Sequence, residues 1–190
     1  MKKTAFLALA FAVLLLTNGC VFSISELYTA ADLVYDPALV GIWDQDGKPT
    51  NTWTFEKADE SGYKVVVVEG ERSSPFKAHL VRLGGHHFLD VCPDPSGLAE
   101  LKQTELFKAG LIRGHLFLKV LQIQPTLQMT ILDDDWLGKL LQKDPNALAH
   151  REEDGTLVLT APTKTLQDFM VKHWSTEGAW SKDLSNMKRR

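Results

Sequence analysis

The sequence predicts a mainly β domain with added helices (α+β class). We expect an antiparallel barrel or a curved open sheet, with two helices near the C-terminus. In residues 51–57, Trp53 and Phe55 alternate with polar residues, which is the period of a half-buried strand. Two apolar runs flank Gly84-Gly85, a two-residue turn typical of a β-hairpin. Large apolar residues recur at helical spacing after residue 135.

Residues 1–19 have the pattern of a bacterial secretory signal. Lysines at positions 2 and 3 precede an unbroken apolar run over residues 5–16, and a short polar exit leads to Cys20. A helix that spans a bilayer needs ~20 apolar residues, so this run is too short for a stable transmembrane segment. The sequence therefore predicts a cleaved signal peptide over residues 1–19.

The end of this segment resembles the lipobox of bacterial lipoproteins, in which a small residue precedes a cysteine whose thiol takes up lipid. Gly19 and Cys20 match it, whereas Thr17 stands where leucine is usual. The resemblance implies lipidation of Cys20 and, because Val21 follows, attachment to the outer membrane facing the periplasm. Two or three acyl chains give a stable anchor, at about 0.8 kcal/mol for each buried methylene. The alternative is an ordinary signal peptide cut near Gly19, without lipid.

Composition narrows the classes of function. The formal net charge is −3, and the only basic cluster is residues 188–190, so a nucleic-acid-binding protein is not expected. The two cysteines are Cys20 and Cys92. If Cys20 carries lipid, Cys92 has no partner and no disulfide staples the fold. A chain of this length buries enough apolar surface to fold as one domain without a disulfide.

Residues 20–39 are predicted to be a lipid-anchored tether with weak helical content, and the turn signal Asp36-Pro37 lies near its end. Residues 40–180 are predicted to form the β-domain. Within it, the expected strands are 41–44, 51–57, 63–69, 76–83, 86–92, 115–124, 127–131 and 156–160. The four valines of residues 65–68 are apolar on both faces, as expected of a central strand.

Two helices are predicted between and after the last strands. Asp133 to Asp135 provide an N-cap and negative charge at a helix start, and Asp144-Pro145 ends that helix. Pro162-Thr163 opens the second helix, whose apolar face is formed by Leu166, Phe169, Met170 and Trp174. Residues 181–190 are predicted to be a solvated basic tail.

Gly41-Ile42-Trp43 resembles the Gly-x-Trp element that opens lipocalin-like (calycin-type) β-barrels, and the resemblance covers about residues 36–132. It implies that Trp43 closes one end of a barrel and that Gly41 lets the chain turn closely beneath the ring. The sequence departs from the family because no barrel-closing arginine is evident and helices interrupt the strand series. The alternative for Trp43 is a core residue of a β-sandwich.

The best cluster of candidate metal ligands is built around the histidines. His86, Asp90 and Cys92 fall on one face of a predicted strand, but residues i and i+4 of a strand lie about 13 Å apart. One zinc ion would therefore also need His79 or His115 from a neighbouring strand. We expect no metal site and no cofactor. No nucleophile or phosphate-loop motif occurs, so an enzyme is not expected.

The leading hypothesis is a non-enzymatic envelope lipoprotein that holds a small apolar ligand in a pocket of its β-domain. The expected lining residues are Trp43, Trp53, Phe55, Val66, Val68, Leu118 and Val120. The alternative is a structural or assembly module with a packed core. Such a module would dock another envelope protein through the second helix and Trp180.

Overall fold

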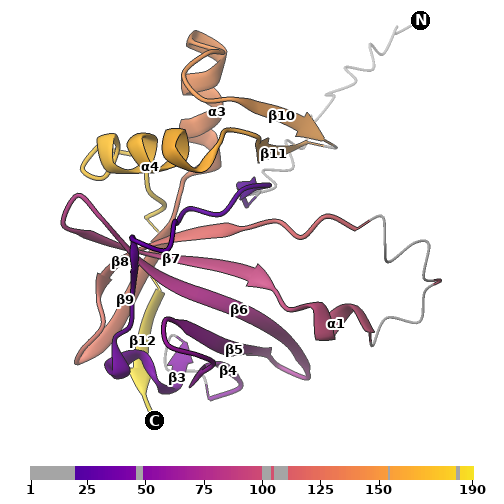
Figure 1. Cartoon of the computed structure of the whole chain (residues 1–190), viewed down its shortest axis with the longest axis vertical. Helices are drawn as coiled ribbons and strands as arrows, with labels where there is room; N and C mark the ends of the chain where they lie inside the picture. Colours follow the sequence, from indigo (N-terminus) through magenta and orange to yellow (C-terminus); the bar gives the residue numbers. More distant parts are fainter. Residues whose placement is uncertain (1–19, 46–48, 100–103, 105–110, 154, 183–184) are drawn as a thin grey trace, which may run out of the picture.

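The computed structural model describes residues 20–45, 49–99, 104, 111–153, 155–182 and 185–190 (Figure 1). The predicted signal peptide, residues 1–19, lies outside the described residues. Across the described ranges, no helix combines the length and the apolar composition needed to cross a membrane.

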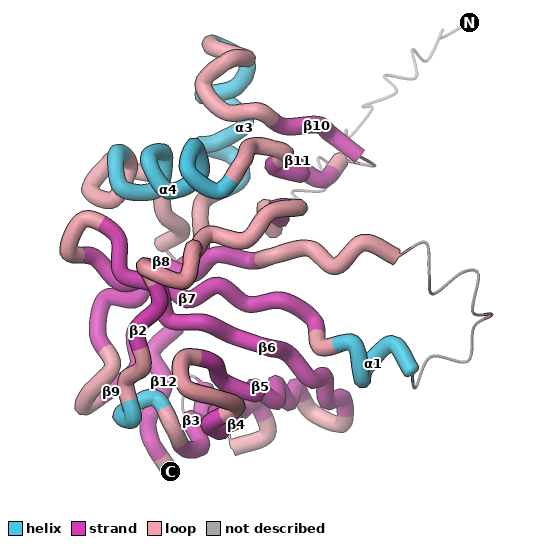
Figure 2. The backbone as a smooth tube through the Cα atoms, viewed as in Figure 1, coloured by secondary structure: helices cyan, strands magenta, loops and turns pink. Residues whose placement is uncertain are grey.

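Short strands make up most of the secondary structure (Figure 2). The strands are β1 (Phe22–Ser23), β2 (Leu33–Val34), β3 (Gly41–Gln45), β4 (Asn51–Lys57), β5 (Gly62–Glu69), β6 (Arg72–Leu83), β7 (His86–Pro93), β8 (Leu116–Gln122), β9 (Thr126–Ile131), β10 (His150–Glu153), β11 (Thr156–Leu159) and β12 (Ser185–Arg189). The helices are the 3-10 turn η1 (Pro37–Leu39), α1 (Pro95–Ala99), α3 (Asp134–Lys143) and α4 (Thr163–Lys172).

Eight antiparallel strands close into a barrel. Each strand from β3 to β9 pairs with the next one along the chain, and β12 pairs with both β9 and β3 to complete the ring. Of the two arrangements that the sequence left open, a closed barrel and an open sheet, the structure is the closed barrel. Closure removes the exposed edges that an open sheet would present.

The prediction of a basic tail over residues 181–190 is wrong, because these residues contain the strand that closes the barrel. Met187 of β12 is buried and pairs with Gln45 on one side and with Leu127 on the other. Only one residue of this strand, Met187, is apolar. A single apolar residue sets no period, so the hydrophobic pattern could not reveal a strand here.

The prediction of a tether over residues 20–39 is also wrong. Val21, Leu27 and Leu39 are buried in the two cores of the molecule. Strand β1 pairs with β11, and strand β2 pairs with β6 just beyond the point where β5 begins. The described chain is therefore part of the folded domain from Val21 onward.

The inside of the barrel holds one apolar cluster, here called the barrel core. Its members are Leu39, Trp43, Phe55, Tyr63, Val65, Ala78, Leu80, Leu89, Val91, Leu118, Val120, Leu127, Met129 and Met187. Successive members along a strand are two residues apart, as expected of side chains that all face one side of a sheet.

A second cluster, here called the outer core, lies against the outside of the barrel wall. Val81, Leu83 and Phe88 supply the barrel side of it, while α3, α4 and the small sheet β1–β11–β10 supply the other side. Figure 1 shows these helices and strands gathered on one flank of the barrel. Helix α3 is capped at its N-terminus by Asp133, whose side chain accepts a hydrogen bond from the Trp136 amide at 2.8 Å.

Candidate functional site

Five of the seven predicted lining residues lie in or against the barrel core. Trp43, Phe55, Leu118 and Val120 are buried in it, and Trp53 is half-buried against it. These side chains pack against one another and against the rest of the barrel core. They are thus part of the packing that holds the barrel together.

The prediction that Val66 and Val68 line the inside of the barrel is wrong, because they lie on the opposite face of β5 from the barrel core. Val65 belongs to that core and Val67 packs against it, while Val66 is 40% exposed. A run of four valines carries no alternation, so the sequence could not decide which pair faces inward. A shift of one residue exchanges the two faces of a strand.

One end of the barrel is organised around Trp43. The guanidinium of Arg189 lies over the Trp43 ring, 5.7 Å from its centroid, and donates to the Val40 carbonyl. Gly41 has a φ of +145°, and a Cβ at this position would come within 3.2 Å of Arg189 Nε. Arg189 therefore links the strand that closes the barrel to the start of its first strand. The sequence did not single out this arginine, because it lies in the predicted tail.

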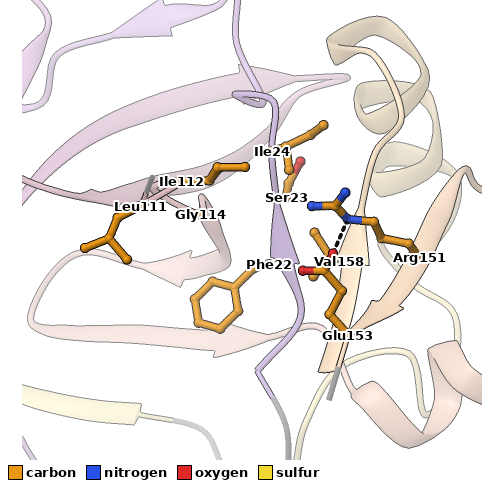
Figure 3. Close-up of a pocket in the computed structure, with 9 residues that line it drawn as sticks. All are labelled: Phe22, Ser23, Ile24, Leu111, Ile112, Gly114, Arg151, Glu153 and Val158. Atoms are coloured by element: carbon orange, nitrogen blue, oxygen red, sulfur yellow. Dashed lines mark ion pairs between the residues drawn. The ribbon is translucent and has the colours of Figure 1, made fainter. Parts of the chain in front are cut away.

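An apolar groove of about 440 Å³ lies outside the barrel (Figure 3). Its lining residues are Phe22, Ser23, Ile24, Leu111, Ile112, Gly114, Arg151, Glu153 and Val158. The site will be called the β1 groove. It lies between the small sheet β1–β11–β10 and the segment 111–114 that leads into β8.

Strand register explains why the small sheet presents an apolar wall. Val158 on β11 pairs with Phe22 on one side and with Arg151 on the other, so these three side chains share one face. Ile24, two residues after Phe22, also lines the groove. The neighbours Val21 and Leu159 are buried in the outer core on the opposite face. The two faces of this short sheet therefore have different roles.

Gly114 and a bridge to β8 hold the other wall of the groove in place. Ser23 and His115 exchange backbone hydrogen bonds of 2.9 and 2.8 Å, which fix β1 against the start of β8. A Cβ on Gly114 would come within 3.1 Å of the Phe22 side chain. Glycine at this position therefore allows the Phe22 ring to lie against the backbone.

The polar rim of the groove is a surface ion pair on β10. Arg151 Nε lies 3.0 Å from Glu153 Oε1, and each side chain is about half exposed. An exposed pair of this kind contributes on the order of 0–1 kcal/mol. The guanidinium can therefore exchange Glu153 for an anionic group of a ligand at little cost.

Of the candidate metal ligands, His115 lies beside Asp90 and Cys92, whereas His86 lies elsewhere. Asp90 Oδ1 lies 2.7 Å from His115 Nδ1, and Oδ2 accepts the Leu27 amide at 2.8 Å. His86 instead stacks on Trp174, with ring centroids 4.2 Å apart. Among the residues that the structure describes, no group of three or more His, Cys, Asp or Glu side chains is arranged to hold a metal ion.

His115, which is paired with Asp90, has a strongly shifted pKa. Burial acts to lower the pKa of His115. Hydrogen bonds to the Asp90 and Cys92 side chains, together with the negative charge beside it, outweigh burial and raise that pKa to about 10. His115 is therefore a cation at neutral pH, paired with a carboxylate that is only 2% exposed. This pair fastens the N-terminal segment and β8 to β7.

A second cavity, of about 350 Å³, lies between α4 and the end of β6. Four of its polar side chains already bond to one another. Lys164 pairs with Asp168, and the Gln167 amide donates to Asp32 at 2.8 Å. This cavity therefore offers a ligand less than the β1 groove does.

The surface expected for docking another protein is not exposed. Trp180 is 8% exposed, and Leu166, Phe169 and Met170 of α4 are buried in the outer core. The apolar face that the sequence showed on this helix covers the barrel wall.

The chain matches no family model, and no curated protein and no solved structure matches it. The β1 groove was missed by reasoning from the sequence. Its one local signal is residues 21–24, Val-Phe-Ser-Ile, in which β-type residues occupy three of four positions. Four residues are too few to separate a strand from a tether.

Proposed function

We propose that this protein is a non-enzymatic lipoprotein of the bacterial cell envelope, anchored through lipid on Cys20. We further propose that it binds a small apolar ligand with an anionic head in the β1 groove. The observation that carries the proposal is the wall formed by Phe22, Val158 and Ile24 beside the exposed guanidinium of Arg151. An apolar tail would lie along the wall, and its head would pair with Arg151.

Size and chemistry support this assignment. Ligand pockets are typically about 300–1,000 Å³ in volume, mostly apolar, with a few polar groups that fix orientation. The groove, at about 440 Å³, has this composition. The barrel core, in contrast, is occupied by large side chains such as Trp43, Phe55 and Tyr63. We therefore place the ligand on the flank of the barrel.

The lipocalin-like relationship remains part of the proposal. It is supported by the closed antiparallel barrel, by Gly41 and Trp43 at its start, and by Arg189 over the Trp43 ring. The location of the anchor in the outer membrane rests on the resemblance of residues 17–21 to a lipobox. Lipid on Cys20 and a nearby apolar groove are consistent with a protein that handles amphiphiles at the membrane.

The ligand site can be tested by measuring the binding of dodecanoate. The measurement is native mass spectrometry of the protein released from a detergent micelle. The native protein should carry one added dodecanoate, and Ile24→Asp should lower the bound fraction at least tenfold, because a carboxylate would then face the apolar tail. Ile42→Asp is the matched control. Ile24 and Ile42 are 42% and 39% exposed, but Ile42 lies on β3, away from the groove. Equal binding by both variants, or no binding by the native protein, would refute the proposal.

A further inference from the structure

Exposed apolar side chains gather at the β1 groove. Phe22, Ile24, Leu111 and Ile112 all line it, and Ile112 is 71% exposed. They come from two separate segments of the chain, as Figure 3 shows. Exposed apolar patches of this kind mark sites where a protein meets another protein or a membrane.

We propose that this face lies directly on the lipid bilayer, with Phe22, Ile24, Leu111 and Ile112 inserted among the acyl chains at the interface. The proposal rests on the lipidation of Cys20, which is part of the proposed function. It adds an orientation of the domain on the membrane and a source for the ligand.

The position of the anchor selects a lipid surface as the occupant of this face. Val21 is buried in the outer core, so the chain enters the fold immediately after Cys20. Phe22 is two residues from Cys20, and an extended chain covers at most about 7 Å over two residues. Acyl chains on Cys20 therefore enter the bilayer within about 7 Å of the backbone of Phe22, at the edge of the exposed apolar patch. Without a tether, the domain cannot turn this face far from the membrane.

Charge on either side of the patch fits the headgroup region. Arg113 follows Ile112 and is exposed, and Arg151, which is paired with Glu153, lies on the opposite rim of the groove. Arginine beside apolar side chains is suited to the membrane interface, because the guanidinium bonds to lipid phosphate while the apolar groups insert. In this orientation the groove opens towards the bilayer, so its ligand would enter from the membrane.

The orientation can be tested by measuring the depth of two nitroxide labels in the membrane. The lipid-modified protein is reconstituted into vesicles of phosphatidylethanolamine and phosphatidylglycerol. One label is placed at Ile112→Cys and the other at Val66→Cys, both in a Cys92→Ser background. Val66 is an exposed apolar residue on β5, and Figure 1 shows β5 far from β10. Both sites are on the surface, so neither label disturbs a core.

We expect the label at position 112 to collide with oxygen several-fold more often than with a water-soluble nickel complex. The label at position 66 should show the reverse. Equal access of nickel to both labels would overturn the orientation, and so would protection of position 112 that depends on an added protein. The mass of the purified N-terminal peptide shows separately whether Cys20 carries lipid. An unmodified Cys20 overturns both the anchoring and the orientation. A lipidated protein with position 112 in water overturns the orientation alone.

Discussion

Arg189, the penultimate residue of the chain, lies over the ring of Trp43 in the first strand of the barrel. Its Nη2 donates to the carbonyl of Val40, while the Trp43 indole donates to the Leu39 carbonyl at 2.8 Å. These contacts join the last strand, β12, to the start of β3. The barrel is thus closed by a stretch of sequence that is almost entirely polar.

Replacing Arg189 tests this closure. Arg189→Ala removes a cation–π contact and a charged hydrogen bond, and should lower the free energy of unfolding by about 1–2 kcal/mol in urea. Lys188→Ala is the control, because Lys188 is exposed on the same strand and its side chain faces away from Trp43. That change should stay within about 0.5 kcal/mol. Equal effects of the two substitutions would mean that the contact does not stabilise closure.

Lysine at two adjacent positions of β5 tests which side chains of this strand face the barrel core. Val65→Lys places a cation in the barrel core and should lower the free energy of unfolding by more than about 4 kcal/mol, or prevent folding. Val66→Lys places the same group in solvent and should change it by less than about 0.5 kcal/mol. The stability of both variants can be measured by circular dichroism during thermal unfolding. A folded Val65→Lys protein of native stability would contradict the assignment of the inward face.

The Asp90–His115 pair predicts a pH dependence of stability. The pKa of His115 is raised from 6.5 to about 10 in the folded protein, so the folded state holds this proton more tightly than the unfolded chain does. The stabilisation is therefore complete below about pH 6.5 and is lost as the pH rises towards 10. His79, whose pKa is lowered by burial, changes stability only below that window.

The difference between native protein and His115→Gln isolates this effect from other groups, such as Lys119, whose pKa is lowered by burial. At pH 6 the variant should be less stable by about 2 kcal/mol, the contribution of a charged hydrogen bond. The difference should shrink as the pH approaches 10. His87→Gln serves as the control, since His87 is on the opposite face of β7 from Asp90. A difference that does not vary with pH would show that the pair is uncharged or unformed.

Local patterns predicted most of the strands and the cap of α3. Trp53 and Phe55 alternate with polar residues, Gly84-Gly85 forms the β6–β7 turn, and Asp133 caps α3. Each of these depends on neighbours a few residues apart, so periodicity and turn chemistry suffice. The two ends of the domain were missed because β1 and β12 have too few apolar residues to set a period.

The candidate site could not be predicted from local patterns at all. Phe22 and Val158 are brought together by a parallel pairing, and Leu111 and Ile112 join them from a third segment. Such pairings depend on which backbone edges remain free once the barrel has closed. The local sequence around each groove residue does not indicate which distant residues will lie beside it.

The sequence by itself determined the class of the fold, the order of most strands and the position of Cys20 just after the apolar run of residues 5–16. These follow from short-range periodicity and composition. Only the tertiary structure decided that the barrel is closed, that residues 21–39 belong to the domain and that Val65 rather than Val66 faces inward. The physical reason is that closure and burial are set by pairing between distant strands. The free energy of that pairing depends on the assembled cores and not on any single segment.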